Sequence, residues 1–218
     1  MRPGRVLEAG PAGATVAAAA AVVSYPRWRG WCLTWGTVED ESTRPLPGDE
    51  LLAEPGVVTT RAIGVDAPPS AVWPWLVQMG PGRAGAYTYD WLENLAGLDM
   101  HSADEIVAEY QHLEVGDSWK LGQKGAVLRV ARLDPDSSLV LRSDDGNWVW
   151  AFVLLPDGDG CRLVSRNRIR WPASTVVARA IALYVMEPGS LVMERKMLLG
   201  IKARAERRHR VAAAAASN

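Results

Sequence analysis

The stretch WVWAFVLLPDGDGCRLVSRNRIRW, residues 148–171, decides the fold. Its two ends, 148–155 and 161–171, are rich in the aromatic and β-branched residues that favour strands. The PDGDG sequence between them supplies Asp and Gly, which suit the tight turn of a hairpin. The stretch therefore predicts two antiparallel strands joined by a short turn.

The second of these strands has two faces of different character, because successive side chains of a strand point to opposite sides. One face carries Cys161, Leu163, Ser165, Asn167, Ile169 and Trp171. The other carries Arg162, Val164, Arg166, Arg168 and Arg170, and we expect it to be cationic and wet. Ser165 and Asn167 would be costly in a dry core without partners. Water or a ligand in a cavity, or neighbouring protein groups, must satisfy them.

The pattern of strands and turns continues on the N-terminal side of this hairpin. Further strands are predicted over 57–65, 116–122, 126–133 and 139–143. Short helices are predicted over 66–80, 87–98 and 101–113. The later strands are separated by turns rich in Asp and Gly, so they form an antiparallel meander.

A glycine motif lies directly after the first predicted helix. Gly80, Gly82 and Gly85 match G-x-G-x-x-G, and Asp104 follows at about the spacing of a dinucleotide-binding acidic residue. That fingerprint has to lie between a strand and a helix, because the pyrophosphate binds at the helix N-terminus. Here the glycines follow a helix instead, so we interpret them as a sharp turn.

Four potential metal ligands lie in the predicted helix 101–113. Ser102 and Glu105 form an S-x-x-E capping box. The candidate ligands are His101, Glu105, Glu109 and His112. Capping and solvation explain them more simply than a metal does, so we expect no metal and no cofactor.

The C-terminal part of the chain is predicted to be helical over 172–186 and 190–210, and Glu187-Pro188-Gly189 between them is expected to kink or break the helix. Helical spacing predicts an apolar stripe that packs onto the sheet. The stripe consists of Met193, Met197 and Ile201, with Leu198 and Ala205 beside it.

Composition indicates a globular protein. The chain has 218 residues, of which 48% are hydrophobic, which suits one domain with a sizeable core. A net charge of −1 gives no general attraction to nucleic acid. Charge is uneven, since 39–54 is acidic and 195–210 is basic. The two isolated cysteines suggest a reducing compartment, and hence the cytoplasm.

The chain is divided by composition into three parts. Residues 1–36 are predicted to be a loosely held Ala-rich segment, 37–210 a single domain, and 211–218 a disordered tail. Within the first part, 12–25 is apolar but shorter than the about 20 residues of a membrane span. A helix is favoured there, with a weak membrane anchor as the alternative. Residues 37–56 are polar and rich in Pro and Gly, which predicts an extended lead-in.

The order of elements is similar to that of the helix-grip fold of the SRPBCC superfamily, which includes START, Bet v 1-like and polyketide cyclase-like proteins. Four motifs resemble an actinobacterial-type branch of it, over about residues 35–208: PLPGDEL (45–51), IGVDAPPSAVWPWLVQMG (63–80), GAYTYDWLENLAGLD (85–99) and MEPGSLVMERKMLLGIKARAE (186–206). The resemblance implies an α+β fold in which a curved antiparallel sheet wraps around a long C-terminal helix, with short helices after the first strand. It also implies a cavity between sheet and helix that holds lipids, sterols or polyketides.

We therefore expect an apolar or aromatic small molecule, lipid- or polyketide-like, in that cavity. The candidate lining residues are Tyr87, Tyr89, Trp91, Trp148, Trp150, Phe152, Ser165, Asn167, Tyr184, Met193 and Met197. Trp148, Trp150 and Phe152 share one strand face. Ordinary core packing is the alternative for each residue.

Two other functions stay open. A cyclase- or dehydratase-like enzyme would need an acid or base and an oxyanion donor near a substrate carbonyl. The available residue types are Tyr87, Tyr89, Asp90, His101 and Glu187, but no catalytic pattern joins them, so no catalytic residue is assigned. A membrane-surface protein would be held weakly by the N-terminal helix or by the basic C-terminal end.

Overall fold

The computed structural model describes residues 25–123, 125–170 and 175–216. The chain divides into two compact units, Met1–Cys32 and Leu33–Asn218. In the first unit, 25–32 are helical. The rest of the Ala-rich segment expected to form a helix lies outside the described residues.

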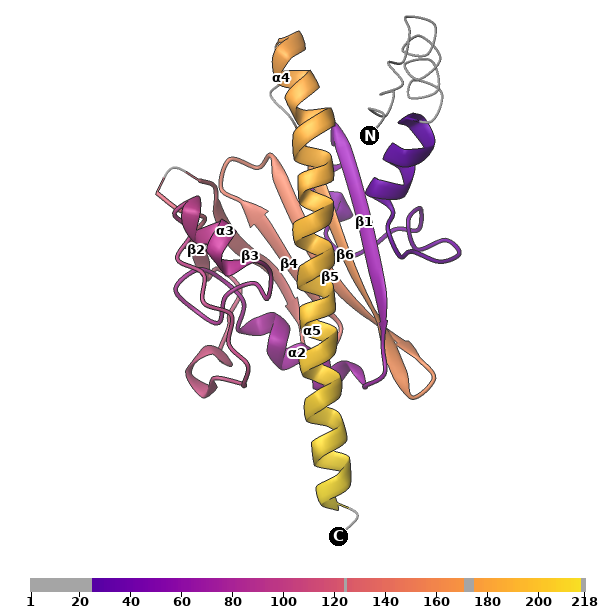
Figure 1. Cartoon of the computed structure of the whole chain (residues 1–218), viewed down its shortest axis with the longest axis vertical. Coiled ribbons are helices and arrows are strands. Elements are labelled where there is room, and N and C mark those ends of the chain that lie inside the picture. The colour runs from indigo at the N-terminus through magenta and orange to yellow at the C-terminus, as the bar shows by residue number, and fades with distance from the viewer. Residues whose placement is uncertain (1–24, 124, 171–174, 217–218) are drawn as a thin grey trace, which may run out of the picture. The chain divides into compact units, whose positions relative to one another are not determined.

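The second unit contains a six-stranded, fully antiparallel sheet in the order β1-β6-β5-β4-β3-β2 (Figure 1). The strands are β1 (Val57–Val65), β2 (Ser118–Lys120), β3 (Val127–Asp134), β4 (Ser138–Ser143), β5 (Trp148–Asp157) and β6 (Gly160–Ile169). The predicted meander over β2–β6 is confirmed. The first strand pairs with the last, so β1 and β2 are the two edges.

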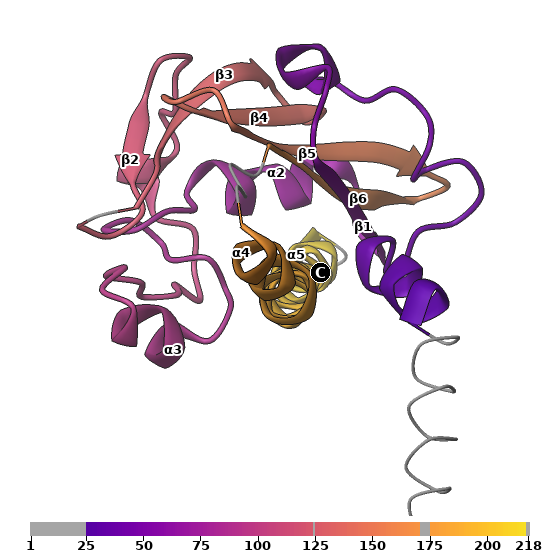
Figure 2. The same ribbon diagram turned by 90° about the horizontal axis from the view of Figure 1, so that it is seen from above.

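The helices lie mainly on one side of this sheet. They are α2 (Pro69–Val77), α3 (Asp90–Leu95), α4 (Val176–Ile181), the π-helical turn η3 (Ala182–Met186) and α5 (Glu187–Ala216), with 3₁₀ turns η1 (Asp49–Leu52) and η2 (Ala108–Tyr110). Seen from above, the sheet curves around α5 (Figure 2). The chain therefore has the α+β helix-grip fold that the resemblance implied.

The core lies between the concave face of the sheet and α5. Buried strand residues such as Leu141, Phe152 and Leu163 pack in one cluster with Leu198 and Ile201 of α5. The buried α5 positions Leu191, Glu194, Leu198, Ile201 and Ala205 are spaced alternately by three and four residues. This spacing keeps one face of the helix against the sheet along its length.

Helix continues through Pro188, although the sequence predicted a kink or a break there. Residues 176–216 stay helical, with the π turn η3 directly before α5. Proline lacks a backbone N–H and its ring clashes with the carbonyl four residues earlier. A π turn is wider than an α-helical turn, so it accommodates this defect without ending the helix. Residues 211–216, assigned from the sequence to a tail, form the last turns of α5.

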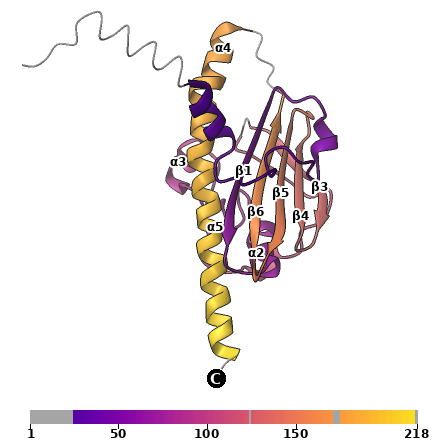
Figure 3. The same cartoon turned by 90° about the vertical axis from the view of Figure 1, so that its right-hand side faces the viewer.

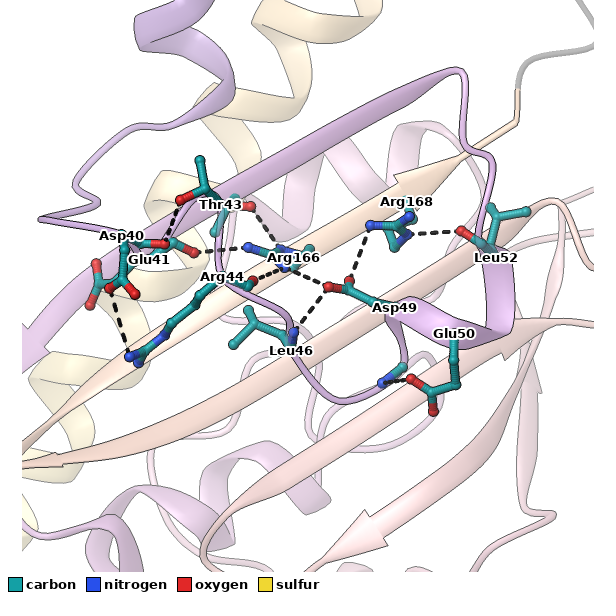
Figure 4. Close-up of polar contacts among 12 residues, drawn as sticks. Asp40, Glu41, Thr43, Arg44, Leu46, Asp49, Glu50, Leu52, Arg166 and Arg168 are labelled. Carbon is teal, nitrogen blue, oxygen red and sulfur yellow. Dashed lines mark hydrogen bonds and ion pairs between the residues drawn. The ribbon is translucent and has the colours of Figure 1, made fainter.

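The convex face of β6 is covered, which corrects the prediction of a cationic, wet surface. The lead-in 37–56 crosses it, and Figure 4 shows Asp49 between Arg166 and Arg168. A carboxylate oxygen of Asp49 lies 2.8 Å from Arg166, which is buried, and the other lies 3.3 Å from Arg168. Glu41 accepts hydrogen bonds from Arg162 at 2.7 and 2.8 Å. The acidic lead-in thus neutralises the arginines of β6. In Figure 3, η1, which belongs to the lead-in, lies on the side of the sheet away from α5.

The helix predicted over 101–113 is also wrong, since only η2 forms there. Ser102 does not cap a helix. Its backbone N–H and hydroxyl donate to Asp90 at 2.7 and 2.6 Å, and the hydroxyl accepts from the Tyr87 N–H. The preceding glycine turn agrees with the prediction, because Gly80 and Gly85 exchange backbone hydrogen bonds and both have positive φ.

Candidate functional site

A pocket of about 470 Å³ opens between α5 and the ends of β1, β5 and β6 that lie nearest α4. Its lining from the strands includes Val57, Thr59, Trp148, Trp150, Asn167 and Ile169, and from the C-terminal helix Met186, Glu187, Ser190, Met193, Glu194 and Met197. Ala86, Thr88 and Glu93 complete it from the α3 region. The lining includes Trp148, Trp150 and Met197, which also pack in or against the core cluster, so the pocket is continuous with the core.

One wall of the pocket is aromatic. Trp148 and Trp150 are stacked, with ring centroids 5.7 Å apart and planes 17° apart, and Trp150 lies 4.8 Å from Phe152. The three alternate along β5, so they lie on its concave face, as the sequence predicted. Phe152 is fully buried in the core. The two tryptophans provide the large, flat apolar surface.

The indole N–H groups are turned toward β6. Trp148 Nε1 donates to Asn167 Oδ1 at 2.8 Å, and Trp150 Nε1 donates to Ser165 Oγ at 2.9 Å. Both bonds run diagonally between the strands, because Trp150 lies opposite Asn167 and Phe152 opposite Ser165, so each indole reaches the residue opposite the next aromatic side chain. The two β6 side chains whose partners the sequence left open are therefore satisfied by neighbouring side chains.

Glu194 of α5 completes this polar wall. Its Oε1 accepts hydrogen bonds from Ser165 Oγ and, at 3.2 Å, from Asn167 Nδ2, and its Oε2 is paired with Arg61 of β1. Arg61 Nη2 also donates to Ser190 Oγ at 3.0 Å. Burial raises the pKa of Glu194, while the Arg61 guanidinium, Ser165 and Asn167 act in the opposite direction.

β1 supplies the cation because of its register with β6. Arg61 lies opposite Ser165, and Thr59 opposite Asn167, on the same concave face. Asn167 Nδ2 also reaches Thr59 Oγ1 at 3.4 Å. Strands distant in sequence thus bring a guanidinium, a hydroxyl and an amide to one carboxylate, and the Thr59 hydroxyl to that amide.

Five of the residues expected to line the site do line the pocket: Trp148, Trp150, Asn167, Met193 and Met197. Ser165 lies one layer behind, bonded to Trp150 and Glu194. The remaining expected residues, Tyr87, Tyr89, Trp91, Phe152 and Tyr184, are not part of the lining. Tyr87 is buried in the core, where its hydroxyl donates to the Trp75 carbonyl, whereas Trp91 and Tyr184 are exposed.

Sequence reasoning missed Glu194 and Arg61. A signal for Glu194 was present, because it falls in the three-and-four spacing of the buried α5 residues between Leu191 and Leu198. The predicted stripe is buried at Met197, Leu198, Ile201 and Ala205, but it was drawn from apolar residues alone and therefore left out Glu194. Arg61 lies on the same face of β1 as Thr59 and Ile63, because every second residue of a strand points to the same side. This spacing indicated that Arg61 faces the core, but nothing in the sequence indicated its partner.

Carboxylates dominate the charged groups of the lining. They are Glu93, Asp145, Glu187 and Glu194, and the lining also includes the guanidinium of Arg170. Burial raises the pKa of Glu93, and the negative charge of Asp90 acts in the same direction. Within the part of the chain that the structure describes, no group of three or more His, Cys, Asp or Glu side chains is placed to hold a metal ion.

No protein-family model and no curated protein matches this sequence. Solved structures do match. A polyketide cyclase-like protein of Corynebacterium glutamicum is 14% identical, with a TM-score of 0.44, over 66% of this chain and 88% of that one. An AHSA1-like protein of Aeromonas hydrophila is 15% identical, with a TM-score of 0.37, over 69% and 92%. A protein of Mesorhizobium loti is 17% identical, with a TM-score of 0.41, over 69% and 98%. Polyketide cyclase-like and AHSA1-like proteins belong to the SRPBCC superfamily, and the likeness concerns the fold alone.

Proposed function

We propose that the protein binds an apolar or aromatic small molecule in the pocket between α5 and the sheet. The observation that carries this proposal is the pocket itself, about 470 Å³ in volume and bordered by Trp148, Trp150 and Met193. Volumes of about 300 to 1,000 Å³ and mainly apolar walls with a few polar groups are typical of small-molecule sites.

The polar wall gives this ligand a chemical preference. The donors of the wall are used within it, since both indole N–H groups and the Asn167 amide bond to wall oxygens. At this wall, hydrogen bonds to a ligand then come from acceptor oxygens, which favours a ligand with a hydroxyl or ammonium group there. The carboxylates of the lining repel a ligand carboxylate.

A matched ligand series tests both parts of the proposal. Dodecanol, dodecylamine and dodecanoate share one chain length and differ in the head group. We expect saturable quenching of tryptophan fluorescence by the alcohol and the amine at submicellar concentrations, and weaker quenching by the carboxylate. Trp148→Phe should reduce the quenching, whereas Trp91→Phe, outside the pocket and 69% exposed, should not.

The outcomes separate the two claims. If none of the three ligands binds saturably, and quenching is insensitive to Trp148→Phe, the proposed site is wrong. If dodecanoate binds as tightly as dodecylamine, the site stands and the preference for donors is wrong.

A cyclase- or dehydratase-like reaction is the second candidate function. The position of Glu194 in the pocket wall supports this candidate, because such a reaction needs an acid or a base beside the bound molecule. A buried carboxyl group at the wall of a ligand pocket is of the kind that acts as a general acid or base. Incubating the protein with a molecule that it binds, and following its mass, tests this. Conversion that Glu194→Gln abolishes while binding persists would support the enzyme, and binding without conversion would support a carrier.

A further inference from the structure

The helical segment before α5 is apolar and exposed. Residues 176–186, which form α4 and η3, contain one charged side chain, Arg179. Six large apolar side chains of this segment are exposed, with exposed fractions from 49% at Met186 to 86% at Val176, whereas Ala182 is buried and Leu183 is half-buried. The six are Val176, Val177, Ile181, Tyr184, Val185 and Met186.

These side chains point in several directions around the helix. Successive residues of an α-helix are about 100° apart, so Val176, Val177 and Val185 do not share one face. In Figures 1 and 3, α4 continues the line of α5 beyond the ends of the strands. A protein partner with a flat apolar surface would cover one side only. A helix that exposes apolar side chains in several directions suits an environment that surrounds most of it.

We propose that residues 176–186 insert into the interfacial region of a lipid bilayer. A window of the helix Val176–Ala216 has a mean hydropathy of 1.4, high enough for a membrane segment, and only 17% of that window is buried. The helix does not span the bilayer. Eleven helical residues are about 16 Å long, against a hydrocarbon core of about 30 Å. Beyond Glu187, α5 packs on the sheet through Leu191 and Leu198.

The insertion brings one end of the pocket to the lipid. Met186 belongs to both the apolar segment and the pocket lining, and Glu187 follows it in the lining. The strand ends Val57 and Ile169 border the pocket at the same end. A bilayer around 176–186 therefore lies against the pocket edge, where an apolar molecule can pass between the two without crossing water.

This surface differs from a purely electrostatic one. Contact through the basic residues 195–210 would weaken as salt screens the charges. Burial of valine, isoleucine and tyrosine does not depend on anionic lipid, so binding through 176–186 persists on neutral vesicles and in high salt.

The test uses the full chain with sucrose-loaded vesicles of phosphatidylcholine, sedimented at low and at high salt. We expect cosedimentation at both. Val177→Asp with Val185→Asp should reduce the partition coefficient by about tenfold or more, because a charged residue is costly in the bilayer. Val211→Asp is the matched control, since Val211 is 66% exposed near the other end of the same helix, and should leave binding unchanged.

Circular dichroism and thermal melting check that the variants keep the wild-type fold, which exposed substitutions are expected to preserve. If the double variant sediments with vesicles as the wild type does, lipid contact comes from elsewhere in the chain and the proposal is wrong. Analytical ultracentrifugation without lipid checks a second outcome. If the wild type is a dimer and the double variant is a monomer, the segment is an interface between two copies of the chain, and the membrane proposal is wrong. Neither result affects the ligand titration above.

Discussion

Glu194 and Arg61 are a buried ion pair at the wall of the pocket. Arg61 is fully buried and Glu194 nearly so. A pair of this kind adds little net stability over apolar residues of similar size, because both charges have lost their hydration. Either partner alone is costly. The pair therefore maintains a polar patch in an otherwise apolar interior. Within this patch Glu194 fixes the side chains of Ser165 and Asn167 through hydrogen bonds.

We predict that Glu194→Leu lowers the free energy of unfolding by about 3 to 5 kcal/mol, because it leaves the Arg61 guanidinium buried without a counter-charge. Adding Arg61→Met to that variant should recover most of the loss. Urea unfolding monitored by circular dichroism measures both. A double variant as unstable as Glu194→Leu alone would show that the guanidinium is not what makes the single substitution costly.

At the scale of elements, the lead-in acts as a cover for the convex face of the sheet. Arg166 donates to the carbonyls of Arg44 and Glu41 as well as to Asp49, all in this segment. Arg166 was expected to face water. Instead it is buried, and its guanidinium donates hydrogen bonds to oxygens of the lead-in. The lead-in has little regular structure, and its position depends on these contacts.

Asp49→Ala should therefore lower the free energy of unfolding by about 3 kcal/mol, since it leaves the buried Arg166 without its carboxylate. Asp40→Asn is the matched control. Asp40 is an exposed carboxylate 3.9 Å from Arg44, and its loss should change stability by less than about 1 kcal/mol. Chemical denaturation compares the two. Equal effects would mean that the ion pair at Arg166 does not hold the lead-in.

The strands were the elements that could be predicted best. The range 57–65 coincides with β1, and the turn sequences placed the other strands within a few residues. The alternation of apolar and polar residues and the residue types of turns involve neighbouring positions in the chain, so both can be recognised from the sequence alone. The helix over 101–113 failed because Ser102 found a partner in Asp90, outside the window that suggested a cap.

At the scale of the whole molecule, what could not be predicted was contact between distant segments. The aromatic wall followed from the alternation of Trp148, Trp150 and Phe152. The polar wall joins β1, β6 and α5, and the outer cover joins 37–56 to β6. Each depends on a pairing across more than a hundred residues, for which a single sequence carries no local signal.

The pH dependence of stability should reveal one of these distant contacts. Burial alone would raise the pKa of Glu41, but hydrogen bonds from Arg162 and the Val38 N–H lower it below its ordinary value. The unfolded chain then binds more protons than the folded one in acid. Stability contributed by Glu41 is present above the ordinary glutamate pKa of about 4.3 and is lost as the pH falls through the lower folded pKa.

We predict that Glu41→Gln flattens the acid side of the stability curve, measured by urea unfolding from neutral pH down to pH about 3. Glu114→Gln, at an exposed position, should leave the curve unchanged. If Glu41→Gln keeps the full wild-type slope, the Arg162 contact does not govern acid stability.

The π turn at Ala182–Met186 has a consequence for how this protein can change. A π turn holds one residue more than the α-helical turn it replaces. Losing a single codon there would restore regular winding while the turns on either side kept nearly the same orientation about the axis, because the wide turn already accommodates the extra residue. This point of the helix therefore lets evolution gain or lose one residue without turning the projecting end or disturbing the interior.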